Sequence, residues 1–153
     1  HRGVAGKYTE LDGDIGMMLA GGGASLTNMD ALIEYGGEPA NYTEYGGNPP
    51  IEKVHRLSKV IMSKDLDGLW HVGGTANNTD ILRTMEGFIQ ALEEERPEYP
   101  IVIRRDGPHA DEAFEILREK REELDINMKL YRNDTPMTQT AEVLMEMVKN
   151  DEN

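Results

Sequence analysis

The chain has 153 residues, no cysteine, and a net charge of −13 from 29 acidic and 16 basic residues. This length suffices for one domain with a full core, and the lack of cysteine, common in cytosolic proteins, excludes disulfide and thiolate chemistry. The acidic excess argues against DNA or RNA as a partner, and no apolar run approaches the roughly 20 residues of a membrane helix. We therefore expect a single cytoplasmic domain over residues 1–153, without nucleic-acid or membrane partners.

The first two predicted strands lie at residues 8–11 and 15–20, on either side of Asp12 and Gly13. An Asp-Gly pair between two strands is a strong hairpin signal, so we expect these strands to form an N-terminal antiparallel hairpin. The second run is almost continuously apolar, as is typical of a strand that is covered on both faces.

The rest of the chain alternates between short apolar runs and segments with a periodic apolar face. Strands are predicted over residues 40–44, 69–72, 101–103 and 128–131. Helices are predicted over residues 26–35 and 111–124, and from the regions of Ile51, Asp80 and Thr135. This order predicts a three-layer, doubly wound α/β domain of the flavodoxin-like or Rossmann-like kind, with a mainly parallel five-stranded sheet.

Glycine-rich turns follow two of the predicted strands. A strand that turns through glycines into a helix leaves free backbone N–H groups, and the helix dipole adds positive potential there. Because the carboxyl ends of parallel strands meet at one edge, these turns are expected to share that edge with the 46–48 loop and with Arg104 and Arg105. We interpret the glycines as an anion or phosphate loop made of Gly21, Gly22, Gly23, Gly73 and Gly74.

Each of these features also has a plainer interpretation. A glycine turn is often only a tight strand-to-helix connection, and Arg104 and Arg105 could both form surface salt bridges. Adjacent residues on a strand point to opposite faces, so at most one of the two arginines can enter the crevice. His55 and His71 lack the spacing of metal ligands, so structural roles and no metal site are expected.

Several segments resemble known families. Residues 11–16 and 36–41 look like the C-terminal domain of succinyl-CoA synthetase β subunits, with an L-D-G start and a G-G-E-P-A-N segment. Two later turns depart from that pattern and resemble ATP-citrate lyase instead. Its A-G-G-G-A-S turn is matched by residues 20–25, and its G-G-S-I-A-N-F-T turn by residues 73–79 with one residue deleted. Its A-N-Y-x-E-Y-x-G-x-P and R-R-x-G-P segments are matched by residues 40–49 and 104–108.

The resemblance, which runs from about Lys7 to Lys149, implies a function. In ATP-citrate lyase this domain binds citrate and follows an ATP-grasp domain. A phosphohistidine on an α-like, CoA-binding subunit passes its phosphoryl group to citrate, and the citryl phosphate then reacts with CoA. By position, the resemblance implies that citrate or a related di- or tricarboxylate contacts Gly47, Thr75, Ala76, Asn77, Asn78, Thr79 and Arg105. Asn78 stands where the family usually has Phe.

The resemblance further implies that ATP, Mg²⁺ and CoA are used by the whole enzyme and that this domain binds none of them directly. It supplies no catalytic residue and is expected to be inactive alone. The first alternative is the ligase domain of an ADP-forming succinyl-CoA synthetase β subunit. An alternative of another class is a stand-alone flavodoxin-like binding module. An ATP-grasp domain before Lys7 would favour the two enzymes, whereas a start codon near His1 would favour the module.

Overall fold

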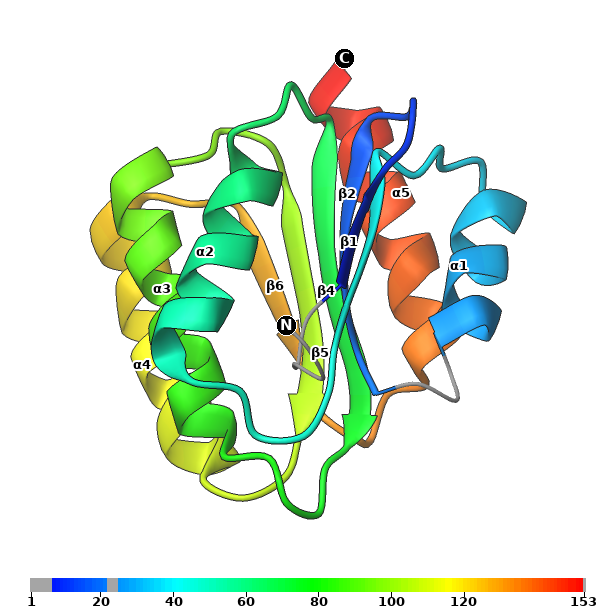
Figure 1. The fold of residues 1–153 in the computed structure, drawn as a ribbon. Coiled ribbons are helices and arrows are strands. Elements are labelled where there is room, and N and C mark those ends of the chain that lie inside the picture. Colours follow the sequence, from blue (N-terminus) through cyan, green and yellow to red (C-terminus); the bar gives the residue numbers. More distant parts are fainter. Residues whose placement is uncertain (1–6, 22–24, 153) are drawn as a thin grey trace.

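The structure is a computed structural model that describes residues 7–21 and 25–152. Five helices and six strands alternate along the chain (Figure 1). The strands are β1 (Lys7–Glu10), β2 (Ile15–Ala20), β3 (Asn41–Tyr45), β4 (Gly68–Thr75), β5 (Ile101–Asp106) and β6 (Met128–Tyr131). The helices are α1 (Ser25–Glu34), α2 (Ile51–Met62), α3 (Ile81–Glu95), α4 (Ala110–Leu124) and α5 (Met137–Glu152).

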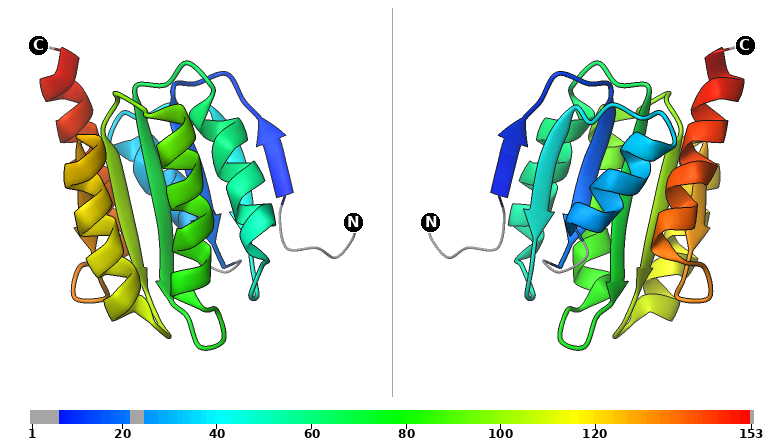
Figure 2. Two further views of the ribbon diagram at one scale, coloured as in Figure 1. Left: turned by 90° about the vertical axis from the view of Figure 1, so that its left-hand side faces the viewer. Right: turned by 90° about the vertical axis from the view of Figure 1, so that its right-hand side faces the viewer.

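The strands form one sheet in the order β1-β3-β2-β4-β5-β6, in which β2 to β6 are all parallel. Helices α2, α3 and α4 cover one face of the sheet, and α1 and α5 cover the other (Figures 1 and 2). The core is accordingly divided into two clusters, one on each side of the sheet. The predicted three-layer, doubly wound α/β fold is confirmed.

The predicted N-terminal hairpin is wrong. Strand β1 pairs antiparallel with β3, with Tyr8 opposite Thr43, and it adds a sixth strand at the sheet edge. The apolar β2 already has β3 and β4 on its two sides, which leaves no edge for β1. Gly13 instead packs against the backbone before β3, where its N–H donates to the Pro39 oxygen at 2.9 Å. A Cβ at Gly13 would lie 2.0 Å from the Glu38 oxygen, so this close crossing explains the glycine.

A buried asparagine joins β2 to β3. The two strands pair directly only at their carboxyl ends, through Leu19 and Ala20. Further back, the Asn41 side-chain oxygen accepts from the Met17 N–H at 3.2 Å, and its amide donates to the Met17 oxygen at 2.8 Å. The side chain thereby satisfies backbone groups that no ladder reaches, which is the usual requirement for a buried polar residue.

Strand β4 extends further than the sequence predicts. Its expected end was Val72, but pairing continues through Gly73, which lies opposite Ala20 of β2, to Thr75, which lies opposite Asp106 of β5. Gly73 and Gly74 are therefore strand residues, and the turn proper begins after Thr75. Within the part of the chain that the structure describes, no helix has the length and apolar character that a membrane crossing requires.

Candidate functional site

A cavity of about 420 Å³ opens at the carboxyl edge of the sheet, where β2, β3, β4 and β5 end. All seven predicted substrate contacts line it, namely Gly47, Thr75, Ala76, Asn77, Asn78, Thr79 and Arg105. Gly21 and Gly74 of the predicted anion loop also line the cavity, whereas Gly73 lies in β4 behind it. Gly22 and Gly23 lie outside the described residues. The fold thus brings together residues that are more than 100 positions apart in the sequence, from Ala20 to Met137.

Hydrogen bonds fix the loops around this cavity to one another. The Thr79 hydroxyl donates to the Gly47 oxygen, and the Asp80 N–H donates to the Asn48 side-chain oxygen at 3.0 Å. On the other side, the Ala76 N–H donates to the Asp106 oxygen at 2.9 Å. The loop after β3, the turn after β4 and the end of β5 therefore form one connected rim.

The N-terminus of α3 is capped by the side-chain carboxylate of Asp80. Asp80 accepts from the Arg83 N–H at 3.2 Å and from His109 Nδ1 at 3.0 Å. Burial works against ionisation, but these hydrogen bonds lower the pKa of Asp80 below its ordinary value. Because this cap already occupies the helix terminus, a bound anion depends on the preceding turn and on Arg105 for its donors.

Arg105 is the buried cation of the cavity, with only 3% of its surface exposed. Its Nη1 donates to the Gly74 oxygen at 2.9 Å, while its buried Nε has no hydrogen-bond partner in the described structure. Gly73 makes room for this side chain, because a Cβ there would lie 2.4 Å from Nη1. A buried guanidinium with an unsatisfied donor is suited to an incoming carboxylate.

Arg104 points to the other face of the sheet, as strand alternation predicts. It donates from Nε to the Thr135 oxygen at 2.9 Å and from Nη1 to the Gly73 oxygen at 3.1 Å. These bonds anchor the segment before α5 to the sheet. The interpretation of both arginines as exposed salt-bridge residues is wrong, since both are buried.

Three further residues at or behind the cavity were not predicted: Tyr45, His71 and Met137. The Tyr45 hydroxyl lies 2.9 Å from His71 Nε2, and both side chains are buried. Burial, with a smaller effect from Arg105, lowers the pKa of His71 to about 3, so its imidazole is neutral at physiological pH. Met137 is the first residue of α5. No local pattern in the sequence connects it with cavity residues that lie 60 or more positions earlier, such as Thr75 and Ala76.

The remaining described histidines lie on other surfaces. His55 contacts Glu94 at 2.8 Å between α2 and α3, and His109 contacts Asp80. These carboxylate contacts are consistent with a structural role for both residues, which is the sequence prediction for His55.

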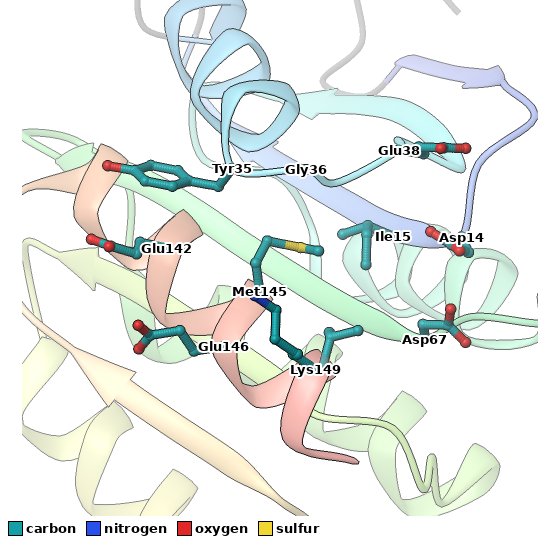
Figure 3. A pocket seen from close by; sticks show the side chains of 11 residues that line it. Asp14, Ile15, Tyr35, Gly36, Glu38, Asp67, Glu142, Met145, Glu146 and Lys149 are labelled. Carbon is teal, nitrogen blue, oxygen red and sulfur yellow. The ribbon is translucent and has the colours of Figure 1, made fainter. Parts of the chain in front are cut away.

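A second cavity of about 470 Å³ lies at the opposite edge of the sheet (Figure 3). Its walls carry Asp14, Glu38, Asp67, Glu142 and Glu146, with Lys149 as the basic residue. Burial, with the neighbouring Asp67, raises the pKa of Asp14, as expected where carboxylates are crowded. This negative environment disfavours carboxylate ligands.

Comparison with known proteins places these features in a family. Residues 2–147 match the family model described as ATP citrate lyase citrate-binding. The structure of ATP citrate lyase from Methanothrix soehngenii in complex with citrate and coenzyme A superposes with a TM-score of 0.87 and 31% identity, over 94% of this chain and 42% of that one. An ATP citrate lyase of Methanosaeta concilii in complex with (3S)-citryl-CoA gives the same TM-score and identity, over 94% of this chain and 40% of that one.

Curated relatives come from the other predicted family. The β subunit of ADP-forming succinate–CoA ligase from Staphylothermus marinus is 37% identical over 117 residues, which are 74% of this chain and 30% of the relative. The same subunit from Halalkalibacterium halodurans is 33% identical over 94% of this chain and 35% of the relative. The chain thus spans about a third of these relatives. With the fold, the cavity and the match over residues 2–147, we conclude that the chain belongs to the ATP citrate lyase citrate-binding family.

Proposed function

We propose that this chain is the citrate-binding part of an ATP-citrate lyase large subunit and that citrate occupies the cavity at Arg105. The observation that carries the proposal is the buried Arg105 guanidinium, whose Nε has no partner and which lies beside the turn at residues 75–79. Charged hydrogen bonds of this kind are the strongest that a carboxylate ligand can make.

The other groups on the cavity wall fit the rest of the citrate molecule. Citrate has three carboxylates and one hydroxyl. The amides of Asn77 and Asn78 and the backbone of the turn can donate to carboxylate oxygens. Thr79 already donates its proton to Gly47, so its oxygen is free to accept from the citrate hydroxyl.

We further propose that the catalytic parts lie outside this chain. An ATP-grasp domain would supply the ATP and Mg²⁺ site, and an α-like subunit or module in the cytoplasm would supply CoA binding and the phosphohistidine. The described histidines support this division, because none of them lines the cavity: His71 is buried behind it, and His55 and His109 contact carboxylates. The electropositive cavity would stabilise citryl phosphate when the two parts meet.

Succinate is the second candidate ligand. The curated relatives at 33% to 37% identity are succinate–CoA ligase β subunits, and this supports a dicarboxylate. We favour citrate because the cavity offers several hydroxyl, amide and backbone groups besides the one arginine. A stand-alone binding module is the remaining alternative, and an ATP-grasp domain encoded before Lys7 would exclude it.

Isothermal titration of the chain with citrate, succinate, malate and phosphate under one salt condition tests the assignment. We expect citrate to bind more tightly than succinate, since its extra carboxylate and hydroxyl have partners on the cavity wall. Equal or tighter binding of succinate would overturn the citrate assignment in favour of the ligase alternative. Preference for phosphate over all three acids would count against a carboxylate site altogether.

A further inference from the structure

Arg105 reaches far across the sheet from its own strand. It starts on β5, passes over Gly73 of β4, and places its guanidinium carbon 5.9 Å from the centre of the Tyr45 ring on β3. The one hydrogen bond that the described structure gives its side chain is from Nη1 to the Gly74 oxygen. The Tyr45 ring is a second contact of the guanidinium beside this one hydrogen bond.

Tyr45 is itself held in one orientation. Its hydroxyl lies 2.9 Å from His71 Nε2, and the two rings meet edge to face at 83° with centres 5.7 Å apart. On its other side His71 packs against Phe88, with ring centres 4.8 Å apart. The chain of contacts therefore runs from the α3 side of the core through His71 and Tyr45 to Arg105.

His71 would be an energetically unfavourable residue at a position whose only role is packing. It is fully buried, and its Nδ1 has no hydrogen-bond partner in the described structure. A buried polar atom without a partner is destabilising, and an apolar side chain of similar volume would avoid that cost. The position is therefore better explained by the hydrogen bond that His71 makes to Tyr45 than by packing.

We propose that Tyr45 and His71 are positioning residues that hold the Arg105 guanidinium in place at the cavity for a ligand carboxylate. This role deepens the proposed citrate function and rests on it. With Nη1 bonded to Gly74 and Nε buried, Nη2 remains as the donor for a ligand carboxylate. The centre of the Tyr45 ring lies 5.9 Å from the guanidinium carbon, and His71 fixes Tyr45 without introducing a second buried positive charge.

A double-mutant cycle measured by citrate titration tests this proposal. Tyr45→Phe keeps the ring but removes the bond to His71, so we expect a loss of affinity of about threefold to tenfold. In an Arg105→Ala background the same change is expected to have no further effect, because Tyr45 acts through Arg105. Tyr99→Phe is the matched control, since Tyr99 donates to the Met62 oxygen at 3.0 Å away from the cavity. Equal losses from Tyr45→Phe in both backgrounds, or equal losses from the control, would overturn the proposal.

A second measurement does not depend on citrate. The Arg105 Nε–H resonance in ¹⁵N spectra of the free chain, identified by its disappearance in Arg105→Lys, reports how firmly the side chain is held. We expect its hydrogen exchange to accelerate in Tyr45→Phe and in His71→Leu, with thermal melts confirming that both variants fold. Unchanged exchange in both folded variants would refute the positioning role. Failure of the wild-type chain to bind citrate would instead refute the proposed function, and the Nε–H result would still decide the positioning role.

Discussion

At the scale of single residues, the proposed citrate site depends on the difference between two adjacent arginines. Arg104 is occupied by backbone oxygens on one face of the sheet, whereas Arg105 enters the cavity with an unpartnered Nε. We expect Arg105→Ala to weaken citrate binding by roughly 1.5–3 kcal/mol, or about tenfold to a hundredfold. Arg105→Lys is expected to restore only part of this, because lysine keeps the charge but lacks the planar fork.

Arg104→Ala is the matched control for that titration. It is expected to lower thermal stability, because three backbone oxygens around β4 and the segment before α5 lose a donor, while citrate affinity changes little. Melting curves recorded beside each titration separate lost folding from lost binding. A larger loss of affinity from Arg104→Ala, with the fold intact, would contradict the assignment of Arg105.

His71 gives the folding stability a specific pH dependence. Burial lowers its pKa from 6.5 to about 3, so between these values the unfolded chain takes up a proton that the folded chain does not. The free energy of unfolding therefore falls as the pH falls through this window, and above about pH 6.5 the residue has no such effect. When the pH falls from 7 to 5, the free energy of unfolding is expected to fall by about 2 kcal/mol less in His71→Leu than in the wild type. The free energy of unfolding of each protein is measured by urea denaturation at several pH values. An equal change with pH in the two proteins across this range would contradict the prediction.

How much of the site could be predicted differs from residue to residue. The glycine turn after β4 and the paired arginines are local signals in the sequence, whereas the resemblance to ATP-citrate lyase selected residues 75–79 and Arg105 as contacts. Tyr45 and His71 carry no such signal, since a tyrosine at the end of one strand and a histidine within another become partners only when β3 and β4 lie two positions apart in the sheet. Met137 is hidden for the same reason.

At the scale of elements, Gly73 is the residue that lets β4 serve the cavity. The sequence suggests that it belongs to an anion-binding turn, but it lies in the strand, where its missing side chain leaves space for Arg105. We expect Gly73→Ala to weaken citrate binding by about tenfold or more and to cost roughly 1–3 kcal/mol of stability. A Cβ there would lie 2.4 Å from Arg105 Nη1 and 2.5 Å from Ala20 Cβ.

Gly74→Ala is the control in the same strand. A Cβ at that position meets only the end of Met137, at 3.9 Å, which is an ordinary contact. Paired calorimetric titrations and melts of the two variants measure the difference. If both substitutions change citrate affinity and melting temperature equally, the close passage of Arg105 over Gly73 does not shape the cavity.

The elements themselves were largely predictable, and the exceptions have a common cause. Helix periodicity located all five helices, and short strand-like segments, of which residues 15–20, 69–72 and 101–103 are mostly apolar, located the five parallel strands. The hairpin was wrong because an Asp-Gly pair reports only on local turn preference, while the partner of β1 is decided by which sheet edge is free. The end of β4 was missed because Gly73 and Gly74 look like a turn until the neighbouring strands are known.

At the scale of the whole molecule, the charged side chains that line the two described cavities differ between the edges of the sheet. The net charge is −13, but the carboxylates that line a cavity gather at the amino edge of the sheet, and Arg105 lies at the carboxyl edge. The polarity of the two edges follows from the parallel strands, which place all βα turns at one end. The same geometry leaves that edge accessible to a catalytic partner.

We predict that the full-length protein docks onto an α-like CoA-binding subunit or module. The chain spans only 30% to 42% of its compared relatives, and none of its described histidines is placed to carry a phosphoryl group into the cavity. Co-purification with the neighbouring gene product, followed by an assay for citryl-CoA, checks this. A full-length protein that forms citryl-CoA with no α-like part would contradict it.

Where citrate binds is the central claim, and chemical-shift mapping measures it directly. Amide resonances of the ¹⁵N-labelled chain, followed during a citrate titration, are expected to shift at Gly47, at residues 75–79 and at Arg105. Those around Asp14, Asp67 and Glu142 at the acidic cavity are expected to stay in place. The largest shifts at the acidic cavity, or shifts at the carboxyl edge that persist unchanged in Arg105→Ala, would contradict the site.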